Sequence, residues 1–76
     1  MGNIKTKLII KNNIHVLRAE RRMTQQELAD QIGVTRATIN AIEGGNYNPS
    51  LELAFRIAQF FEKDIQTIFQ VAGENL

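Results

Sequence analysis

Four neighbouring side chains, between residues 36 and 40, have the chemistry to contact the edges of DNA base pairs. Arg36 can donate two hydrogen bonds to guanine O6 and N7, and Asn40 can pair in the same way with adenine N6 and N7. Ala37 and Thr38 carry methyl groups that suit the methyl group of thymine. A solvated helix face more often carries Glu and Lys, so we interpret this segment as a binding face. The alternative is an exposed helix with unselected polar residues.

These side chains need a helix that a second helix holds in place, and the stretch QQELADQIGVTRATINAI, residues 25–42, predicts both. Thr24 is followed three residues later by Glu27, the capping-box spacing, which predicts a helix over about residues 25–31. Gly33 follows at the corner, where a left-handed backbone favours glycine. The small or apolar positions that fit a helix-turn-helix are Leu28, Ala29, Ile32, Gly33, Val34, Ile39 and Ile42. The alternative is an ordinary helical hairpin in a bundle.

The length and composition limit the classes of protein that remain. The 76 residues predict one domain, residues 1–76, and the absence of cysteine excludes disulfides and thiolate metal sites. A single histidine and no converging carboxylate pair argue against an enzyme, and we expect no metal and no cofactor. No apolar run approaches the ~18 residues of a membrane span. With no visible signal peptide, these features favour a cytoplasmic protein without a membrane partner.

The charge is distributed unevenly along the chain, although the net charge is only +1. Residues 1–22 hold six basic residues and one acidic residue, a net charge of +5, whereas residues 23–50 and 51–76 each carry −2. This asymmetry predicts a positive rim from the N-terminal third and an acidic back. Solubility alone would explain the same pattern.

The remaining segments predict three more helices and two short strands. We expect residues 1–7 to be flexible and residues 13–69 to form a helical core. Its first, fourth and fifth helices are predicted over about residues 13–22, 51–61 and 65–69, and Asn12 or Asn13, Ser50 and Asp64 are the predicted caps. The inward face of the fourth helix is predicted to be Leu51, Ala54, Ile57, Ala58 and Phe61. The β-favouring residues 8–10 could pair with residues 70–72 as a two-stranded antiparallel ribbon.

The stretch LRAERRMTQQELADQIGVTRATINAIEGGNYNPSLELAFRIAQFF resembles the Cro/CI-type helix-turn-helix family, also called XRE-family regulators. With the following IQTIF the resemblance covers residues 13–69. The segments LIIKNN and FQVA make the chain similar to the small cytolysin-repressor-type members, which add a terminal β ribbon and form dimers. The resemblance implies an all-α fold of five helices with a helix-turn-helix, plus that ribbon.

The resemblance also implies roles for individual residues. The base-facing positions would be Arg36, Ala37, Thr38 and Asn40. The positions that contact the DNA backbone would be Gln25, Thr35, Asn46, Tyr47 and Asn48. Arg18 and Glu43 would form a structural ion pair, and the dimer interface would include Phe60, Ile65 and Phe69. Where many relatives have glycine after the fourth helix, this chain has Glu62, which would be strained in a left-handed turn.

The function that follows is a DNA-binding transcription regulator, with repression as the expected mode. As a homodimer it would bind double-stranded DNA at a near-palindromic operator, with each recognition helix in a major groove. The alternative is an antitoxin-like or coactivator-like protein-interaction module with the same fold. That module would bind a protein partner through Phe55, Phe60 and the C-terminal segment.

Overall fold

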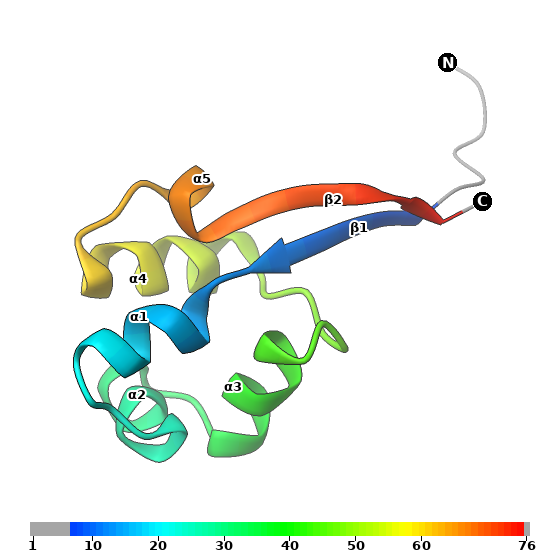
Figure 1. Ribbon diagram of the computed structural model, residues 1–76. Helices are drawn as coiled ribbons and strands as arrows, with labels where there is room; N and C mark the ends of the chain where they lie inside the picture. Colours follow the sequence, from blue (N-terminus) through cyan, green and yellow to red (C-terminus); the bar gives the residue numbers. More distant parts are fainter. Residues whose placement is uncertain (1–6, 76) are drawn as a thin grey trace.

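The structure, a computed structural model, describes residues 7–75 of the chain. Five helices form a rounded body, and two strands extend from it as a ribbon (Figure 1). This arrangement confirms the predicted all-α fold with a short terminal ribbon. The predictions for residues 1–6 lie outside the described residues. In chain order the elements are β1 (Lys7–Asn12), α1 (Ile14–Glu20), α2 (Gln25–Ile32), α3 (Arg36–Glu43), α4 (Leu51–Phe61), α5 (Ile65–Ile68) and β2 (Phe69–Asn75).

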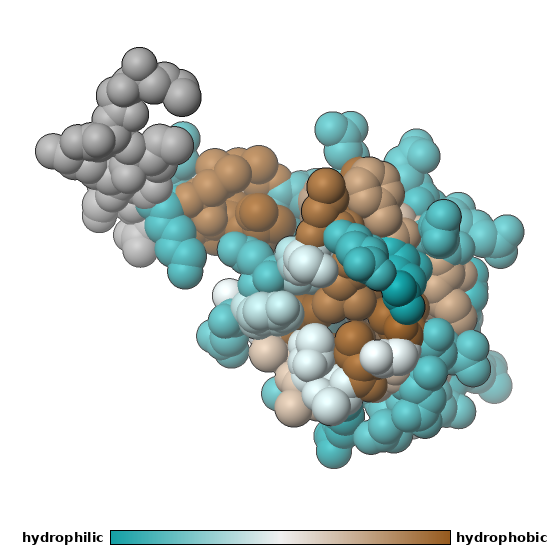
Figure 2. Space-filling model, turned by 180° about the vertical axis from the view of Figure 1, so that it is seen from behind, coloured by the Kyte–Doolittle hydropathy of each residue, from teal (hydrophilic) through white to brown (hydrophobic). Residues whose placement is uncertain are grey.

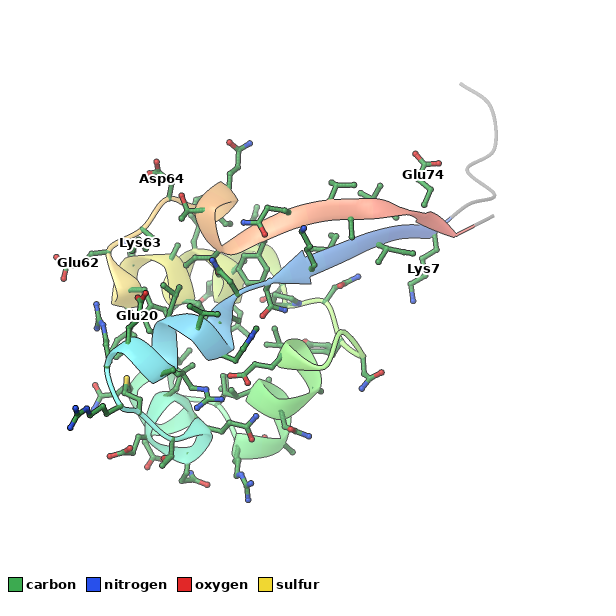
Figure 3. All side chains as sticks on the ribbon, viewed as in Figure 1. Lys7, Glu20, Glu62, Lys63, Asp64 and Glu74 are labelled. Carbon is green, nitrogen blue, oxygen red and sulfur yellow. The ribbon has the colours of Figure 1, made fainter. Side chains whose placement is uncertain are left out.

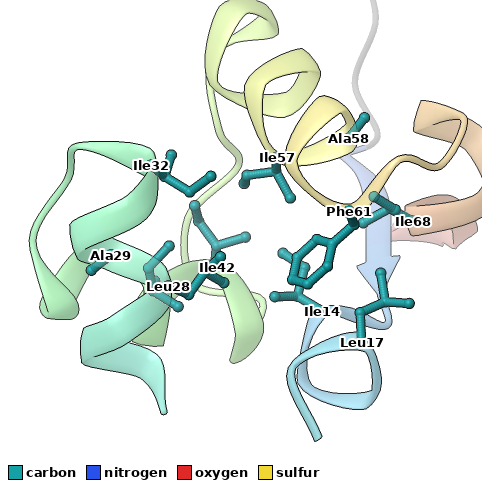
Figure 4. Packing of buried hydrophobic residues seen from close by; sticks show 11 residues of the cluster. Ile14, Leu17, Leu28, Ala29, Ile32, Ile42, Ile57, Ala58, Phe61 and Ile68 are labelled. Carbon is teal, nitrogen blue, oxygen red and sulfur yellow. The ribbon is translucent and has the colours of Figure 1, made fainter. Parts of the chain in front are cut away.

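One hydrophobic core joins all five helices. In Figure 4 the ring of Phe61 lies close to Ile14, Leu17 and Ile68, while Ile57 lies between that group and the side chains of α2. The largest fully buried side chains are Ile14, Leu28, Ile39, Ile42, Ile57 and Ile68. Burying one such side chain contributes roughly 1.5–3 kcal/mol, so this cluster determines how the helices are oriented.

Side-chain caps begin three of the helices where the sequence predicts them. Thr24 and Glu27 form the full capping box at α2, each side chain accepting the other residue's backbone N–H. Thr35 accepts from the backbone N–H of Thr38 at α3, and Ser50 accepts from that of Leu53 at α4. Asn13 and Asp64 precede α1 and α5 without a side-chain cap bond. Each satisfied cap is worth about 1 kcal/mol.

Two helices end in left-handed residues that are not glycine. Helix α1 ends at Glu20 rather than near residue 22 because Arg22 has φ 54°, and the N–H of Met23 donates back to the carbonyl of Arg18. Helix α4 ends in the same way at Glu62, with φ 55°. Glu62 thus takes the left-handed turn in which a residue other than glycine is strained, and α4 ends at Phe61 as predicted. The predicted end of the first helix is wrong, because α1 ends at Glu20 and not near residue 22. Both ends use Schellman-type hydrogen bonds, which satisfy terminal carbonyls.

Three other predicted boundaries or positions are wrong. Leu51 does not face the core: it is 71% exposed, because the first turn of α4 lies at the edge of the body. Helix α5 ends at Ile68, since Phe69 takes an extended conformation and begins β2. Lys7, predicted to be flexible, begins β1 because it pairs with the end of β2.

The ribbon is longer than the predicted strands and contains a bulge. Strands β1 and β2 pair antiparallel from Asn12 opposite Phe69 to Lys7 opposite Asn75. Ile9 lies opposite Gly73 and Ile10 opposite Val71, which leaves one extra residue on β2. A bulge of this kind bends a strand and increases its twist. The two strands leave the helical body together at its α5 side (Figure 1).

Two kinds of feature are absent from the part of the chain that the structure describes. Within residues 7–75, no helix is long and apolar enough to cross a membrane. The same part of the chain contains no group of three or more His, Cys, Asp or Glu residues that could hold a metal ion.

Candidate nucleic-acid interface

Helices α2 and α3 are joined by a short corner that fixes the angle between them. Gly33 adopts φ 88°, a left-handed conformation that is strained for other residues, and its N–H donates to the carbonyl of Ala29. Ala29 itself is fully buried, so its small side chain lets the two helices approach closely. Val34 packs against the core from the corner. The corner thus sets the direction in which α3 presents its outer face.

The outer face of α3 carries polar side chains because its inner face is fully occupied by the core. Ile39 and Ile42 are buried, whereas Arg36, Ala37 and Asn40 are exposed. This separation is the usual amphipathic pattern of a helix on a protein surface. What remains outside is one guanidinium, one methyl group and one carboxamide, all within the first five residues of α3.

Thr38 differs from its neighbours because it is half-buried. Its hydroxyl lies 3.0 Å from the hydroxyl of Thr35, and its backbone N–H donates to the same Thr35 oxygen at 3.2 Å. Thr35 therefore has two tasks at the helix start, as a cap and as the partner of Thr38. The pair fixes the rotamers of both hydroxyl groups at the N-terminal end of the exposed face.

Gln25, the first residue of α2, links that helix to the end of α3. Its Nε2 donates to Asn40 Oδ1 at 3.3 Å and to Glu43 Oε1 at 3.2 Å. This hydrogen bond to Oδ1 fixes the orientation of the Asn40 carboxamide, and therefore also the direction of its NH₂ group. The geometry brings together two residues that the sequence assigned to different roles, one toward the DNA backbone and one toward the bases.

Arg18 and Glu43 form an ion pair that ties α1 to α3. Arg18 Nε and Nη2 donate to the two carboxylate oxygens of Glu43 at 2.6 and 2.9 Å, and Nη1 donates to the carbonyl of Met23 at 2.8 Å. The side chains are 17% and 9% exposed, so water reaches the pair only in part. Such a bidentate geometry is the strong form of the interaction.

The protonation equilibria reflect this pairing. The hydrogen bond to Glu43 raises the pKa of Arg18, and its charge adds to the effect against the opposing effect of burial. Burial alone would raise the pKa of Glu43, but the hydrogen bonds from Arg18 and Gln25 lower it below its ordinary value, helped by the charges of Arg18 and His15. Both groups are therefore held in their charged forms at neutral pH.

The loop after α3 presents the other predicted residues. Asn46, Tyr47 and Asn48 are all exposed, and the N–H of Asn46 donates to the carbonyl of Ala41 at 2.9 Å. Gly44 is closely surrounded: a Cβ there would lie 3.2 Å from Asn46 Nδ2 and 3.3 Å from the carbonyl of Asn40. The loop is thus folded back tightly onto the end of α3 and stands beside its exposed face.

Asn12, at the end of β1, is a positioning residue that the sequence interpretation considered only as a helix cap. Its Nδ2 donates to the carbonyl of Ile42 at 2.9 Å, and its Oδ1 accepts from the N–H of Ile14 at 3.2 Å. It therefore connects the ribbon to the last turn of α3. No sequence pattern could have indicated a contact across thirty positions.

The predicted dimer residues lie in two different places. Ile65 and Phe69 line one apolar groove of about 290 Å³, between the ribbon, the loop and α4. Phe60 is elsewhere, beside Phe61 with a ring-centroid distance of 5.1 Å, and the guanidinium of Arg21 lies 5.1 Å from both rings. The complete lining of the groove is Ile10, Asn48, Pro49, Leu51, Ala54, Ile65 and Phe69.

A braced pair of helices with an outward polar face on the second one defines the class of helix-turn-helix proteins that bind DNA. A family model described as "Helix-turn-helix" matches residues 14–68. The chain is 52% identical over 60 residues to an uncharacterized HTH-type transcriptional regulator of Methanocaldococcus jannaschii, an alignment that covers 79% of this chain and 91% of that protein. The chain belongs to the Cro/CI-type, or XRE, helix-turn-helix family of DNA-binding transcriptional regulators.

Two further similarities extend this comparison. The cryptic phage CTXphi transcriptional repressor RstR of Vibrio cholerae is 34% identical over 65 residues, which cover 86% of this chain and 59% of the repressor. The crystal structure of the transcriptional regulator VanUg superposes with a TM-score of 0.75 over 96% of this chain and 99% of that chain, at 24% sequence identity. At that identity the structural similarity supports the fold alone.

Proposed function

We propose that this protein is a sequence-specific transcriptional repressor that binds a near-palindromic operator as a homodimer in the cytoplasm. The observation that carries the proposal is the outward face of α3, where Arg36, Ala37 and Asn40 are exposed while the same helix is anchored through Ile39 and Ile42. A helix of this width fits the major groove, where each base pair presents a distinct pattern of donors and acceptors.

In the proposed complex, the exposed side chains of α3 select the sequence. Arg36 donates to guanine O6 and N7, Asn40 contacts adenine, and the methyl groups of Ala37 and Thr38 contact thymine. Because Thr38 is half-buried and hydrogen-bonded to Thr35, we propose that it contributes least of these four residues to base contacts. Arg36 is the strongest candidate for a base-specific contact, because its guanidinium is charged and bidentate.

Contacts to phosphate would set the register of the protein on DNA. We propose Gln25, Thr35, Asn46, Tyr47 and Asn48 for this role, because they flank the exposed face of α3 from the start of α2 and from the loop. The backbone N–H groups at the start of α2 add a favourable site for a phosphate. These contacts do not distinguish sequences, so they should govern affinity and its salt dependence.

The homodimer is proposed to form at the apolar groove. The groove adjoins Asn48 and Pro49 of the loop after α3, so a contact there lies close to the proposed DNA-binding loop. We propose a two-fold axis that turns both recognition helices toward the same side of the dimer. Half-sites about one helical turn, ~34 Å, apart would then follow. Ile65 and Phe69 belong to this interface, whereas we leave Phe60 out because it packs beside Arg21 at the other end of α4.

Repression rather than activation is proposed from two considerations. A relative with 34% identity is named as a transcriptional repressor. A small DNA-binding unit can repress simply by occupying promoter DNA, which requires no further surface. The proposed protein-interaction alternative would instead use exposed apolar residues such as Phe55 to bind a different protein.

Selection of bound sites from random double-stranded DNA tests this proposal. We expect an enriched near-palindrome, and we expect Arg36→Ala to weaken binding to it by about 1–3 kcal/mol while relaxing preference at one base pair per half-site. Arg56→Ala is the matched control, since Arg56 is an exposed arginine on α4 paired with Glu52. Binding without sequence preference, or equal effects of Arg36→Ala and Arg56→Ala, would contradict the proposed base contacts of the exposed face of α3.

A further inference from the structure

The ribbon carries exposed apolar side chains for which the described part of this single chain provides little cover. Leu8 and Ile9 are each 45% exposed and Val71 is 62% exposed. A two-stranded ribbon is marginally stable alone, and within residues 7–75 no further strand pairs with either of its outer edges. In Figure 1 the outer part of the ribbon extends beyond the helices. In Figure 3 Lys7 and Glu74 extend from opposite sides of its far end.

The pairing of the strands sorts these side chains onto two faces. Successive residues of a strand point to opposite faces, and directly paired residues share a face. Leu8 and Ile10 therefore share one face, and Val71 joins them because it lies opposite Ile10. Ile9 points to the other face, which it shares with Lys7 and Lys11. Glu74 lies opposite Leu8 and therefore shares this face at its outer end. Apart from Glu74, the outer part of the face is apolar, whereas Ile9 on the other face is flanked by two lysines.

The apolar face of the ribbon continues into the groove proposed as the dimer interface. Ile10 lines that groove. Residues 7–10 of β1, from both faces, line a separate cleft of about 190 Å³ beside the loop at residues 45–48. Figure 2 shows apolar surface along the ribbon and on the neighbouring body. The seven residues that line the groove are all uncharged, so a two-fold arrangement brings no like charges together there.

The size of the groove indicates what must cover the ribbon. A stable protein interface uses roughly 20–30 residues on each side, and the groove provides seven. The adjoining apolar face of the ribbon is the surface that can supply more of the missing contact. The ribbon begins at the edge of the groove, which Ile10 and Phe69 line, and its outer part extends beyond the helices (Figure 1). In an isologous dimer, both subunits contribute the same surface, so each would contribute its own ribbon face and its own groove.

We propose that the ribbon is a dimerisation arm: its face with Leu8, Ile10 and Val71 packs against a second copy of this chain and extends the contact that begins at the groove. This inference rests on the proposed homodimer and adds the arm as its main new contact. The bulge on β2 serves it by bending the outer half of the ribbon.

Two neighbouring residues on β1 offer a closely matched test. Leu8→Lys places a charge on the proposed contact face, whereas Ile9→Lys places the same charge on the opposite face at equal initial exposure. Sedimentation equilibrium on the full chain should give a dimer dissociation constant raised at least tenfold by Leu8→Lys and changed less than twofold by Ile9→Lys.

Val71→Lys is the second variant, on the other strand of the same face, and we expect a similar tenfold weakening. Far-UV circular dichroism must show the wild-type helix content for each variant. Equal effects of Leu8→Lys and Ile9→Lys on the dimer dissociation constant, in folded proteins, would overturn the proposed dimerisation arm. The proposed function would still stand if the wild-type chain binds a palindromic site as a dimer. A wild-type chain that stays monomeric at all concentrations would overturn both, and would mean that a different partner covers this face.

Discussion

Replacing Arg18 by methionine should be among the most destabilising single changes outside the core. The substitution removes two charge-assisted hydrogen bonds to Glu43, at 2.6 and 2.9 Å, and one to the carbonyl of Met23, at 2.8 Å. The methionine side chain retains much of the apolar stem. Glu43 is then left at 9% exposure with Gln25 as its remaining donor among the described residues.

The magnitude follows from how far the pair is buried. Breaking one partner of a fully buried pair costs about 3–5 kcal/mol, and an exposed pair is worth about 0–1 kcal/mol. With side chains 17% and 9% exposed, the pair lies near the buried limit but water can still reach it. We therefore expect Arg18→Met to lower the free energy of unfolding by about 3 kcal/mol. A core of this size rarely supplies more than ~3–5 kcal/mol, so much of the stability would be lost.

A double-mutant cycle, with each variant unfolded in urea, measures the interaction between Arg18 and Glu43. Arg18→Met, Glu43→Met and the double variant should show a coupling energy of about 2–3 kcal/mol, because the double variant leaves no unpaired charge. Protein concentration must be constant across the set, since dimerisation would add to the apparent stability. Arg56→Met, in the exposed Glu52 pair, is the control and should change the free energy by less than about 0.5 kcal/mol.

The pH dependence has a definite sign. Because the pKa of Glu43 is lowered in the folded state, its contribution is fully present above its ordinary pKa of 4.5 and is lost as the pH falls through the folded value. Wild-type stability should decline on that acid side, and Glu43→Gln should lack this part of the decline. A coupling energy below about 1 kcal/mol, with the same acid profile in wild type and Glu43→Gln, would refute the reasoning.

Three further changes test other parts of the structure. Glu62→Gly should raise the free energy of unfolding, measured in urea, by about 0.5–1 kcal/mol, because Glu62 has φ 55°. The control Lys63→Gly should lower the free energy of unfolding. If both variants lower it, Glu62 is not strained. Thr24→Ala removes the capping box of α2 and should cost about 1 kcal/mol by thermal unfolding, whereas no change would mean that the cap is replaced by water. Gln25→Ala should weaken operator binding in a gel-shift titration and lower discrimination as well, because Gln25 also holds Asn40; a loss of affinity with unchanged discrimination would argue for phosphate contact alone.

Much of the fold could be predicted because its signals are local. The capping box at Thr24, the left-handed Gly33 and the apolar spacing from Leu28 to Ile42 each act within a few residues, and all appear in the structure. The end of α1 was not predicted, because Arg22 lacks the glycine that usually marks a left-handed turn; Glu62 takes the same conformation after α4 without glycine. There the packing of the next segment forces a conformation that the residue itself disfavours.

The sequence alone determined the residue types on α3 and most of its division into a buried and an exposed face, whereas the half-burial of Thr38 was decided by the tertiary structure. Contacts between distant segments were decided only by the tertiary structure: Arg18 with Glu43, Gln25 with Asn40, and Asn12 with the carbonyl of Ile42. The same holds for the exposure of Leu51 and for the groove beside it. The physical reason is that helix and turn propensities act over one or two turns, whereas these contacts depend on how the core orients whole helices.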